Sequence, residues 1–355
     1  MSFTPFNAPL LGGLLGDLEA VAFFSVKADL DCMIRFEVAL AQAEAAHGVI
    51  PAEAAQAIAK GLEGFDPDIR AIGAATARDG LAVPELVRQM RAAIGEPQDA
   101  YLHFGTTSQD LIDTSLIIRI KGLCDLLESR LLQAESELER LETAFGGNVL
   151  MARTRMQAAI AVTVADRIAA WRQPLAEHRA RLTELKPRLL RLQFGGAAGT
   201  LDKLADKAEP VTEELAGLLG LHLSTRNWHT DRSAIVEFAN WLSLVTGSLG
   251  KIGQDVALMA QNGIDEIALS GTGGSSAMPH KQNPVLAETL VTLARFNATQ
   301  LAGMHHALVH EQERSGAAWT LEWMLLPQMC VATGAATRTV ITLLGAVERM
   351  GIEQE

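Results

Sequence analysis

Cysteine, aromatic side chains and long apolar runs are all scarce in this chain of 355 residues. Its three cysteines (Cys32, Cys124 and Cys330) are odd in number and widely spaced, which excludes a disulfide framework and a Cys-x-x-Cys metal site. No stretch reaches about 18 consecutive apolar residues, the length of a membrane-spanning helix. The start of the chain also lacks the basic and apolar segments of a secretory signal. We therefore predict a cytoplasmic protein with no membrane partner.

Positively charged residues are also fewer than negatively charged ones. The chain has 30 Lys and Arg residues against 42 Asp and Glu residues, a net charge of −12 at pH 7. Such a balance argues against nucleic acid as a partner but leaves room for a local basic pocket that binds a small anion. His306 and His310 are four residues apart, but Arg314 stands where a His-Glu-x-x-His zinc motif needs its second histidine. We predict neither a metal nor another cofactor.

Strand patterns are almost absent, and helical patterns dominate. After an irregular segment that covers residues 1 to 25, helices are expected at 27–47 and 52–63. Further on, four stretches repeat apolar residues at alternating steps of three and four, which places them on one stripe of a helix. They begin at Leu127, Ile168, Ile235 and Leu286, and they end at Phe145, Leu192, Met259 and Met304. The sequence thus predicts an all-α fold built on long helices.

Helices this long need partners along their whole apolar stripe. A repeat close to 3.5 residues favours near-parallel packing in a bundle. Because one chain supplies too few long helices to surround every stripe, we expect an oligomer whose core is a shared bundle. A monomeric helical bundle is the alternative.

The most informative segment lies between two helical stretches, at residues 270–284. It reads Ser-Gly-Thr-Gly-Gly-Ser-Ser-Ala-Met-Pro-His-Lys-Gln-Asn-Pro and includes Ser275, Ser276, Lys281 and Asn283. A phosphate-binding loop is excluded, because no strand precedes the glycines and the lysine does not follow the last of them. A solvated linker would need none of these polar residues. A loop that closes over a substrate fits the pattern better.

Three other segments carry polar groups beside helices. In residues 101–114, Thr106, Thr107 and Ser108 could cap a helix while they offer donors to an anion, although Thr106 alone is more typical of a plain cap. His103, in the same segment, would by itself more often be structural. Residues 151–157 place two arginines and Gln157 before an apolar helix, and residues 193–200 form a glycine-rich turn.

Taken together, these segments resemble the fumarase/aspartase superfamily. Residues 274–284 are similar to its signature loop, residues 103–114 to its first shared region, and residues 152–157 to its second. The resemblance implies a homotetramer with a central bundle of long helices and active sites that combine segments from three subunits. It also implies an N-terminal helical domain (1–104), a central bundle domain (105–345) and a shortened remnant of a C-terminal domain (346–355).

Within the superfamily, residues 36–51 and 310–323 resemble the cycloisomerase branch, whose members close a lactone ring on a small tricarboxylate. By this resemblance, Ser275 transfers the carbon-bound proton, and Lys281 and Asn283 stabilise the enolate-like carboxylate. The same resemblance implies that the substrate carboxylates are bound by Thr107, Ser108, Gln157 and Ser276, with Arg314 as a further candidate. A lyase that releases fumarate or ammonia is the alternative, and a catalytically silent structural relative is a second one.

One departure from the family pattern has a chemical meaning. Arg155 stands where the amine-releasing members have a histidine, whose partner glutamate matches Glu288. A leaving amine needs a proton donor, whereas a carboxylate with a pKa of about 4 does not. Arginine cannot shuttle protons but can bind a carboxylate through two parallel hydrogen bonds. Arg155 therefore favours carboxylate addition over amine elimination, unless it only pairs with Glu288, and His103 is left as an acid or carboxylate binder.

Overall fold

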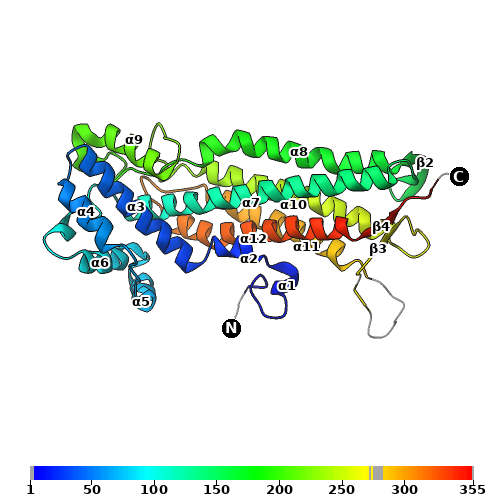
Figure 1. Cartoon of the computed structure of the whole chain (residues 1–355), viewed down its shortest axis with the longest axis horizontal. Coiled ribbons are helices and arrows are strands. Elements are labelled where there is room, and N and C mark those ends of the chain that lie inside the picture. Colours follow the sequence, from blue (N-terminus) through cyan, green and yellow to red (C-terminus); the bar gives the residue numbers. More distant parts are fainter. Residues whose placement is uncertain (1–3, 272, 275–282, 354–355) are drawn as a thin grey trace.

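The computed structural model describes residues 4–271, 273–274 and 283–353. Long helices run side by side along the long axis of the molecule, as Figure 1 shows. They are α7 (Ser108–Phe145), α8 (Val164–Leu189), α10 (Ser233–Met259), α11 (Val285–His306) and α12 (Ala317–Gly345). The predicted, mostly helical architecture is thereby confirmed.

The apolar stripes expected from the sequence form the contacts of this bundle. Helix α10 packs against α8, α11 and α12, and α7 packs against α8 and α12. Every stripe residue of α10 from Ile235 to Met259 is buried, as is the α7 stripe from Leu127 to Leu141. Burial of each such leucine or isoleucine contributes about 1.5–3 kcal/mol. The bundle is therefore stabilised along the full length of its helices.

Helix α12 has no stripe, although it is one of the longest helices described. All residues from Met329 to Thr337 are buried, so this part of the helix is enclosed on every side. A helix that is covered all round shows no apolar periodicity. This is why the sequence pattern identified four long helices and did not single out this one.

Most of the N-terminal elements gather at one end of the bundle, and two short helices lie alongside its middle (Figure 1). Two short helices, α1 (Gly12–Leu15) and α2 (Leu18–Ala22), occupy the segment expected to be irregular. The helices predicted at 27–47 and 52–63 are α3 (Val26–Ala46) and α4 (Ala52–Gly61). The same end holds α5 (Ile69–Asp79), α6 (Val83–Ile94), α9 (Ala208–Leu219) and the short 3-10 helices η1 (Gln98–Tyr101) and η2 (Asp202–Lys207).

The described residues include four short strands at the opposite end, although the sequence carries almost no strand pattern. β1 (Val149–Thr154) and β2 (Gln157–Thr163) form an antiparallel hairpin, and β3 (Ile267–Leu269) pairs with β4 (Val347–Met350). Most of β2 is exposed in the chain, so its side chains do not alternate between an apolar and a polar face. Without that alternation the sequence carries no strand pattern. Among the described residues, no helix is long and apolar enough to cross a membrane.

Candidate active site

A buried carboxylate organises the turn that precedes α7. Asp110 Oδ2 accepts hydrogen bonds from the Thr107 backbone N–H and the Thr106 hydroxyl, both at 3.1 Å. The same carboxylate also accepts from the backbone N–H groups of Gly195 (3.0 Å) and Gly196 (2.9 Å). Asp110 is completely buried, so these bonds are shielded from solvent. This one side chain therefore holds the Thr106–Ser108 turn against the glycine-rich turn at 193–200.

This geometry divides the three hydroxyl residues of the turn. The Thr106 hydroxyl is used within the chain, where it donates to Asp110, although the N-cap of α7 is Thr107. Ser108 begins α7, is partly exposed and makes no side-chain hydrogen bond with any described residue. The free N–H groups of the first helical turn lie beside it, an arrangement that favours an anion. Thr107 is the N-cap of α7 and shares a capping box with Asp110, so Ser108 is the hydroxyl of this turn without a partner among the described residues.

A second buried network lies one turn further along α7. Arg232 is 1% exposed and donates to both Asp113 oxygens (2.7 and 3.0 Å) and to both Glu322 oxygens (2.9 and 2.5 Å). The Trp319 indole N–H also donates to Asp113, at 3.1 Å. Because each charge has several partners, this cluster ties α7, the start of α10 and α12 together.

The network reaches the surface through Gln109. Its amide nitrogen donates to Asp113 (3.1 Å), and its amide oxygen accepts from Arg314 Nε (3.2 Å). A second Arg314 nitrogen donates to the Ala197 carbonyl, at 3.1 Å. Arg314 itself is exposed. The structure thus brings Arg314 to the same end of the bundle as Thr107 and Ser108.

His103 lies at this same end of the molecule, where it contacts Glu37 of helix α3. Its Nδ1 lies 2.5 Å from Glu37 Oε1, and Glu37 is only 1% exposed. Glu44, two helical turns further along α3, is fully buried, and neither of its carboxyl oxygens has a hydrogen-bond partner among the described residues. Burial, assisted by the Glu37 charge, raises the pKa of Glu44 to about 9. Glu44 is therefore neutral near pH 7, and Glu37 is left as the charged partner of His103.

At the opposite end, the second shared segment lies on the β1–β2 hairpin instead of on a loop before a helix. Arg155 occupies its turn with a φ of 49°, and Gln157 begins β2. Arg153 forms an ion pair with Glu266, because its Nη1 donates to both Glu266 carboxylate oxygens at 2.8 Å. Arg155 forms no ion pair with any described residue, and it lines a cavity of about 420 Å³ together with Arg153, Arg167 and Lys251. Its guanidinium is thus available to an anion.

The ends of the predicted signature loop lie near this hairpin (Figure 1). Gly273 and Asn283 exchange two backbone hydrogen bonds, at 3.0 and 2.9 Å. Ser275, Ser276 and Lys281 lie outside the described residues. Glu288, in the first turn of α11, is exposed and forms no ion pair with Arg155 within the chain.

The candidate site residues therefore form two groups at opposite ends of one chain. His103, Thr107, Ser108 and Arg314 lie near the start of α7, whereas Arg155, Gln157, Asn283 and Glu288 lie toward the other end of the bundle. Helix α7 has 38 residues, which corresponds to a length of roughly 57 Å at 1.5 Å per residue. A single chain does not bring the two groups to one substrate.

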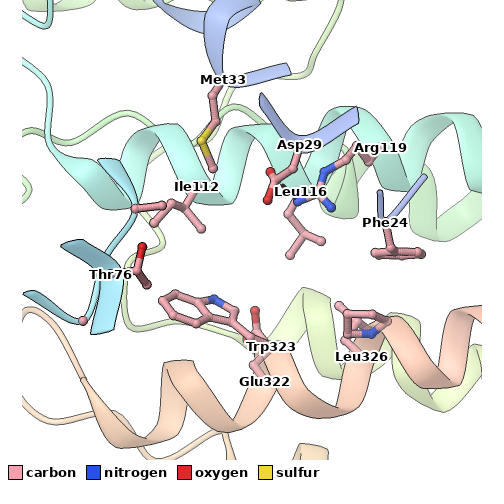
Figure 2. A pocket seen from close by; sticks show the side chains of 13 residues that line it. Phe24, Asp29, Met33, Thr76, Ile112, Leu116, Arg119, Glu322, Trp323 and Leu326 are labelled. Carbon is pink, nitrogen blue, oxygen red and sulfur yellow. Dashed lines mark ion pairs between the residues drawn. The ribbon is translucent and has the colours of Figure 1, made fainter. Parts of the chain in front are cut away.

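A separate cavity of about 350 Å³ lies between α3, α7 and α12, and Figure 2 shows its lining. Met33, Leu116, Trp323 and Leu326 make it largely apolar, and the Arg119–Asp29 ion pair (2.9 Å) closes one side. It contains none of the candidate site residues. Its one link to the polar network described above is Glu322, which lines the cavity.

Sequence inspection missed the residues that position this site. Asp110 and Asp113 stand inside the quoted segment 101–114, and their spacing of three residues was a signal that both lie on one helical face. Arg232, Glu322 and Glu37 come from distant parts of the sequence and had no such signal. Only the fold places them beside α7.

Comparison with known proteins agrees with the motifs. A lyase family model matches residues 19–299. The 3-carboxy-cis,cis-muconate cycloisomerase of Pseudomonas aeruginosa is 42% identical over 92% of this chain and 72% of its own length. The enzyme of the same name from Bradyrhizobium diazoefficiens is 38% identical over 95% of this chain and 76% of its own.

Solved structures show the same relationship. The 3-carboxy-cis,cis-muconate lactonizing enzyme from Pseudomonas putida superposes with a TM-score of 0.92 at 38% identity, over 96% of this chain and 78% of that one. A fumarate lyase from Mesorhizobium sp. BNC1 superposes with a TM-score of 0.90 at 31% identity, over 97% and 78% of the two chains. The chain therefore belongs to the lyase family that its motifs resemble, the fumarase/aspartase superfamily.

Proposed function

We propose that this chain is a cycloisomerase that converts 3-carboxy-cis,cis-muconate to 4-carboxymuconolactone, a step in the degradation of aromatic compounds. The observation that carries this proposal is the 36–42% identity, over more than nine-tenths of the chain, with four cycloisomerases of that name. The guanidinium of Arg155, which is exposed and has no ion-pair partner among the described residues, supports it, because a carboxylate nucleophile needs binding and no proton transfer.

The reaction balances without a redox partner, since substrate and product are isomers. One substrate carboxylate oxygen forms a bond to a carbon of the diene, and the displaced π electrons move onto the carboxylate conjugated with it. The enolate-like carbon then takes a proton, which completes the lactone. The chain must therefore bind three carboxylates, stabilise the extra negative charge and deliver one proton to carbon.

We assign these tasks to the residues carried over from the family pattern. Ser275 delivers the proton, and Lys281 and Asn283 stabilise the enolate-like carboxylate. The substrate carboxylates are bound by Thr107, Ser108, Gln157, Ser276, Arg314 and Arg155. His103 and Glu288 complete the set, His103 as a carboxylate binder or acid and Glu288 beside Arg155.

A homotetramer with shared active sites follows from the same proposal. The separation of the two groups along α7 supports it, because an antiparallel neighbour would bring its Arg155 end to the His103 end of this chain. Exposed apolar side chains on the bundle and hairpin, such as Leu244, Met324 and Ile160, also favour association. The division into domains 1–104, 105–345 and 346–355 and the cytoplasmic location stay predictions.

The direct test follows the ultraviolet absorbance of 3-carboxy-cis,cis-muconate with the purified protein and a chelator present. Loss of the diene absorbance with the native protein and not with Ser275→Ala is the expected result. No loss from a well-folded protein would contradict the proposal.

A fumarate-releasing lyase is the second candidate, because the fumarate lyase structure has nearly the same fold at 31% identity. Incubation with succinyl adducts of amino acids, thiols and nucleotides distinguishes the two. Release of fumarate from one of them, with the muconate untouched, would favour this candidate.

A further inference from the structure

His103 is held in an unusual backbone conformation. Its φ is 62°, in the left-handed region that non-glycine residues rarely adopt. On one side, Leu102 is buried, and its carbonyl accepts a hydrogen bond from Arg91 at 3.0 Å. On the other side, Gly105 also has a positive φ, of 68°. Such strain persists only where the surrounding structure enforces it, and it often accompanies function.

Glu37 determines which ring nitrogen of His103 is free. A carboxylate can only accept, so the 2.5 Å contact requires the hydrogen of His103 to sit on Nδ1. The other nitrogen, Nε2, has no hydrogen bond to any described residue, and the side chain is 17% exposed. The ring therefore presents Nε2 outward, toward the same end of the bundle as Thr107 and Ser108.

The environment of Glu37 shows that this pairing is built into the fold. Glu37 lies on the buried face of α3, which packs against α7. Its second oxygen has no partner among the described residues, so its charge is directed at His103 alone. Glu44, the other carboxyl of this face, is neutral at pH 7 because of its raised pKa. A single buried negative charge thus stands behind the imidazole.

We infer that Glu37 is a positioning residue for the proposed reaction: it holds the Nδ1 hydrogen and the direction of the His103 ring, so that Nε2 faces the substrate. This inference rests on the proposed function. When the ring carries both hydrogens, Nδ1 donates to Glu37 and Nε2 donates to a substrate carboxylate. The carboxylate–histidine pairs that orient imidazole ligands in metal sites use the same Nδ1–H contact, although there Nε2 gives its lone pair to the metal.

A double-mutant cycle tests this role. Glu37→Gln preserves the shape of the side chain and removes its charge, and we expect it to lower kcat/KM about tenfold, the lower end of the effect in metal sites. In a His103→Ala background the same substitution should change kcat/KM by less than about twofold, because nothing remains to be positioned. Glu44→Gln is the matched control, since it replaces a carboxyl that is already neutral, and it should leave kcat/KM unchanged.

A merely structural Glu37 would give a different pattern. Glu37→Gln would then lower kcat/KM equally in both backgrounds and would lower the melting temperature in parallel. Either that pattern or an unchanged kcat/KM in the Glu37→Gln variant would overturn the inference.

The tautomer can be measured without any substrate. In the full-length protein with ¹⁵N-labelled histidine rings, the His103 signals are identified by their loss in His103→Gln. We expect a protonated Nδ1, whereas a bare Nδ1 with the hydrogen on Nε2 would refute the pairing. If the native protein failed to convert the muconate, the proposed function would fall, and this measurement would still decide whether Glu37 fixes the ring.

Discussion

The buried carboxyl group of Glu44 makes the stability of the folded chain depend on pH. Its pKa is about 9 in the folded chain and about 4.5 in a solvated carboxyl, and desolvation is the main cause. Between these values the unfolded chain loses a proton that the folded chain retains, so stability falls as the pH rises from 5 to 9. The stability that depends on a protonated Glu44 is fully present only below the ordinary pKa of a carboxyl group, and it is lost as the pH rises toward the pKa of Glu44 in the folded chain.

The Glu44→Gln variant removes that titration. We expect its melting temperature to match that of the native protein near pH 5 and to exceed it at pH 8, where the difference in unfolding free energy should reach about 1 kcal/mol or more. Thermal unfolding at both pH values measures the effect. An equal difference at the two pH values would show that Glu44 is not neutral in the folded protein.

Arg155 is the residue on which the choice between the two candidate functions depends most. Arg155→Ala should lower kcat/KM for the muconate about tenfold to a hundredfold, because hydrogen bonds to charged groups contribute about 1.5–3 kcal/mol. Arg155→Lys keeps the charge without the planar fork and should recover only part of the loss. Met156→Ala, at the neighbouring and 72% exposed position, is the control. Unchanged kcat and KM in Arg155→Ala would leave this arginine without a role in the reaction.

At the scale of the elements, the contact of α10 with α11 depends on a missing side chain. A Cβ atom at Gly253 would lie 2.5 Å from the Ala287 carbonyl oxygen and 2.8 Å from Leu290 Cβ. Both obstacles belong to the facing helix, whose backbone cannot move without disturbing α12. This glycine therefore sets the distance between the two helices.

Gly253→Ala should destabilise the protein by about 1–3 kcal/mol, the usual cost of an overpacked core. Gly73→Ala is the matched control, because Gly73 lies in helix α5 and a Cβ there meets nothing within 4 Å. That variant should be neutral or stabilising by about 0.5–1 kcal/mol. Urea unfolding of both variants decides the matter, and equal stabilities would mean that α10 and α11 adjust freely.

Helix patterns were predictable only where a helix has two different sides. The stripes of α8 and α10 could be found because one face of each helix meets the core and the other does not. Helix α12 and strand β2 could not be found in this way, since α12 is enclosed around its middle and β2 is mostly exposed. The place of Arg155 on a hairpin turn could therefore not be derived from periodicity.

At the scale of the whole molecule, we propose that neighbouring subunits complete each other's sites, because the two groups of site residues lie at opposite ends of one chain. We expect a tetramer of about 152 kDa, four times the 38.0 kDa chain, in sedimentation equilibrium. His103→Ala and Arg155→Ala alter opposite ends, so each homotetramer has only defective sites. In randomly mixed tetramers about a quarter of the sites would combine two intact ends, which should restore up to about a quarter of native activity.

Coexpression of the two variants with different affinity tags, followed by tandem purification, provides the mixed tetramers. A mixture of the separately purified proteins, kept unexchanged, is the control and should stay at the low activity of the parents. Mixed tetramers without recovered activity would argue that each site is built within one chain.

Residue types and their spacing along the chain were enough to predict the class of this protein. The apolar stripes required long packed helices, and the serine–lysine segment at 270–284, the 103–114 segment and Arg155 indicated the family and the kind of chemistry. These features are local, because they depend on residue types at fixed spacing along the chain. Tertiary structure alone decided that Glu37 lies against His103, that Arg232 joins Asp113 to Glu322, and that the two groups of site residues lie at opposite ends. Such contacts join residues 66 to 119 positions apart, and no spacing rule reaches across a folded chain.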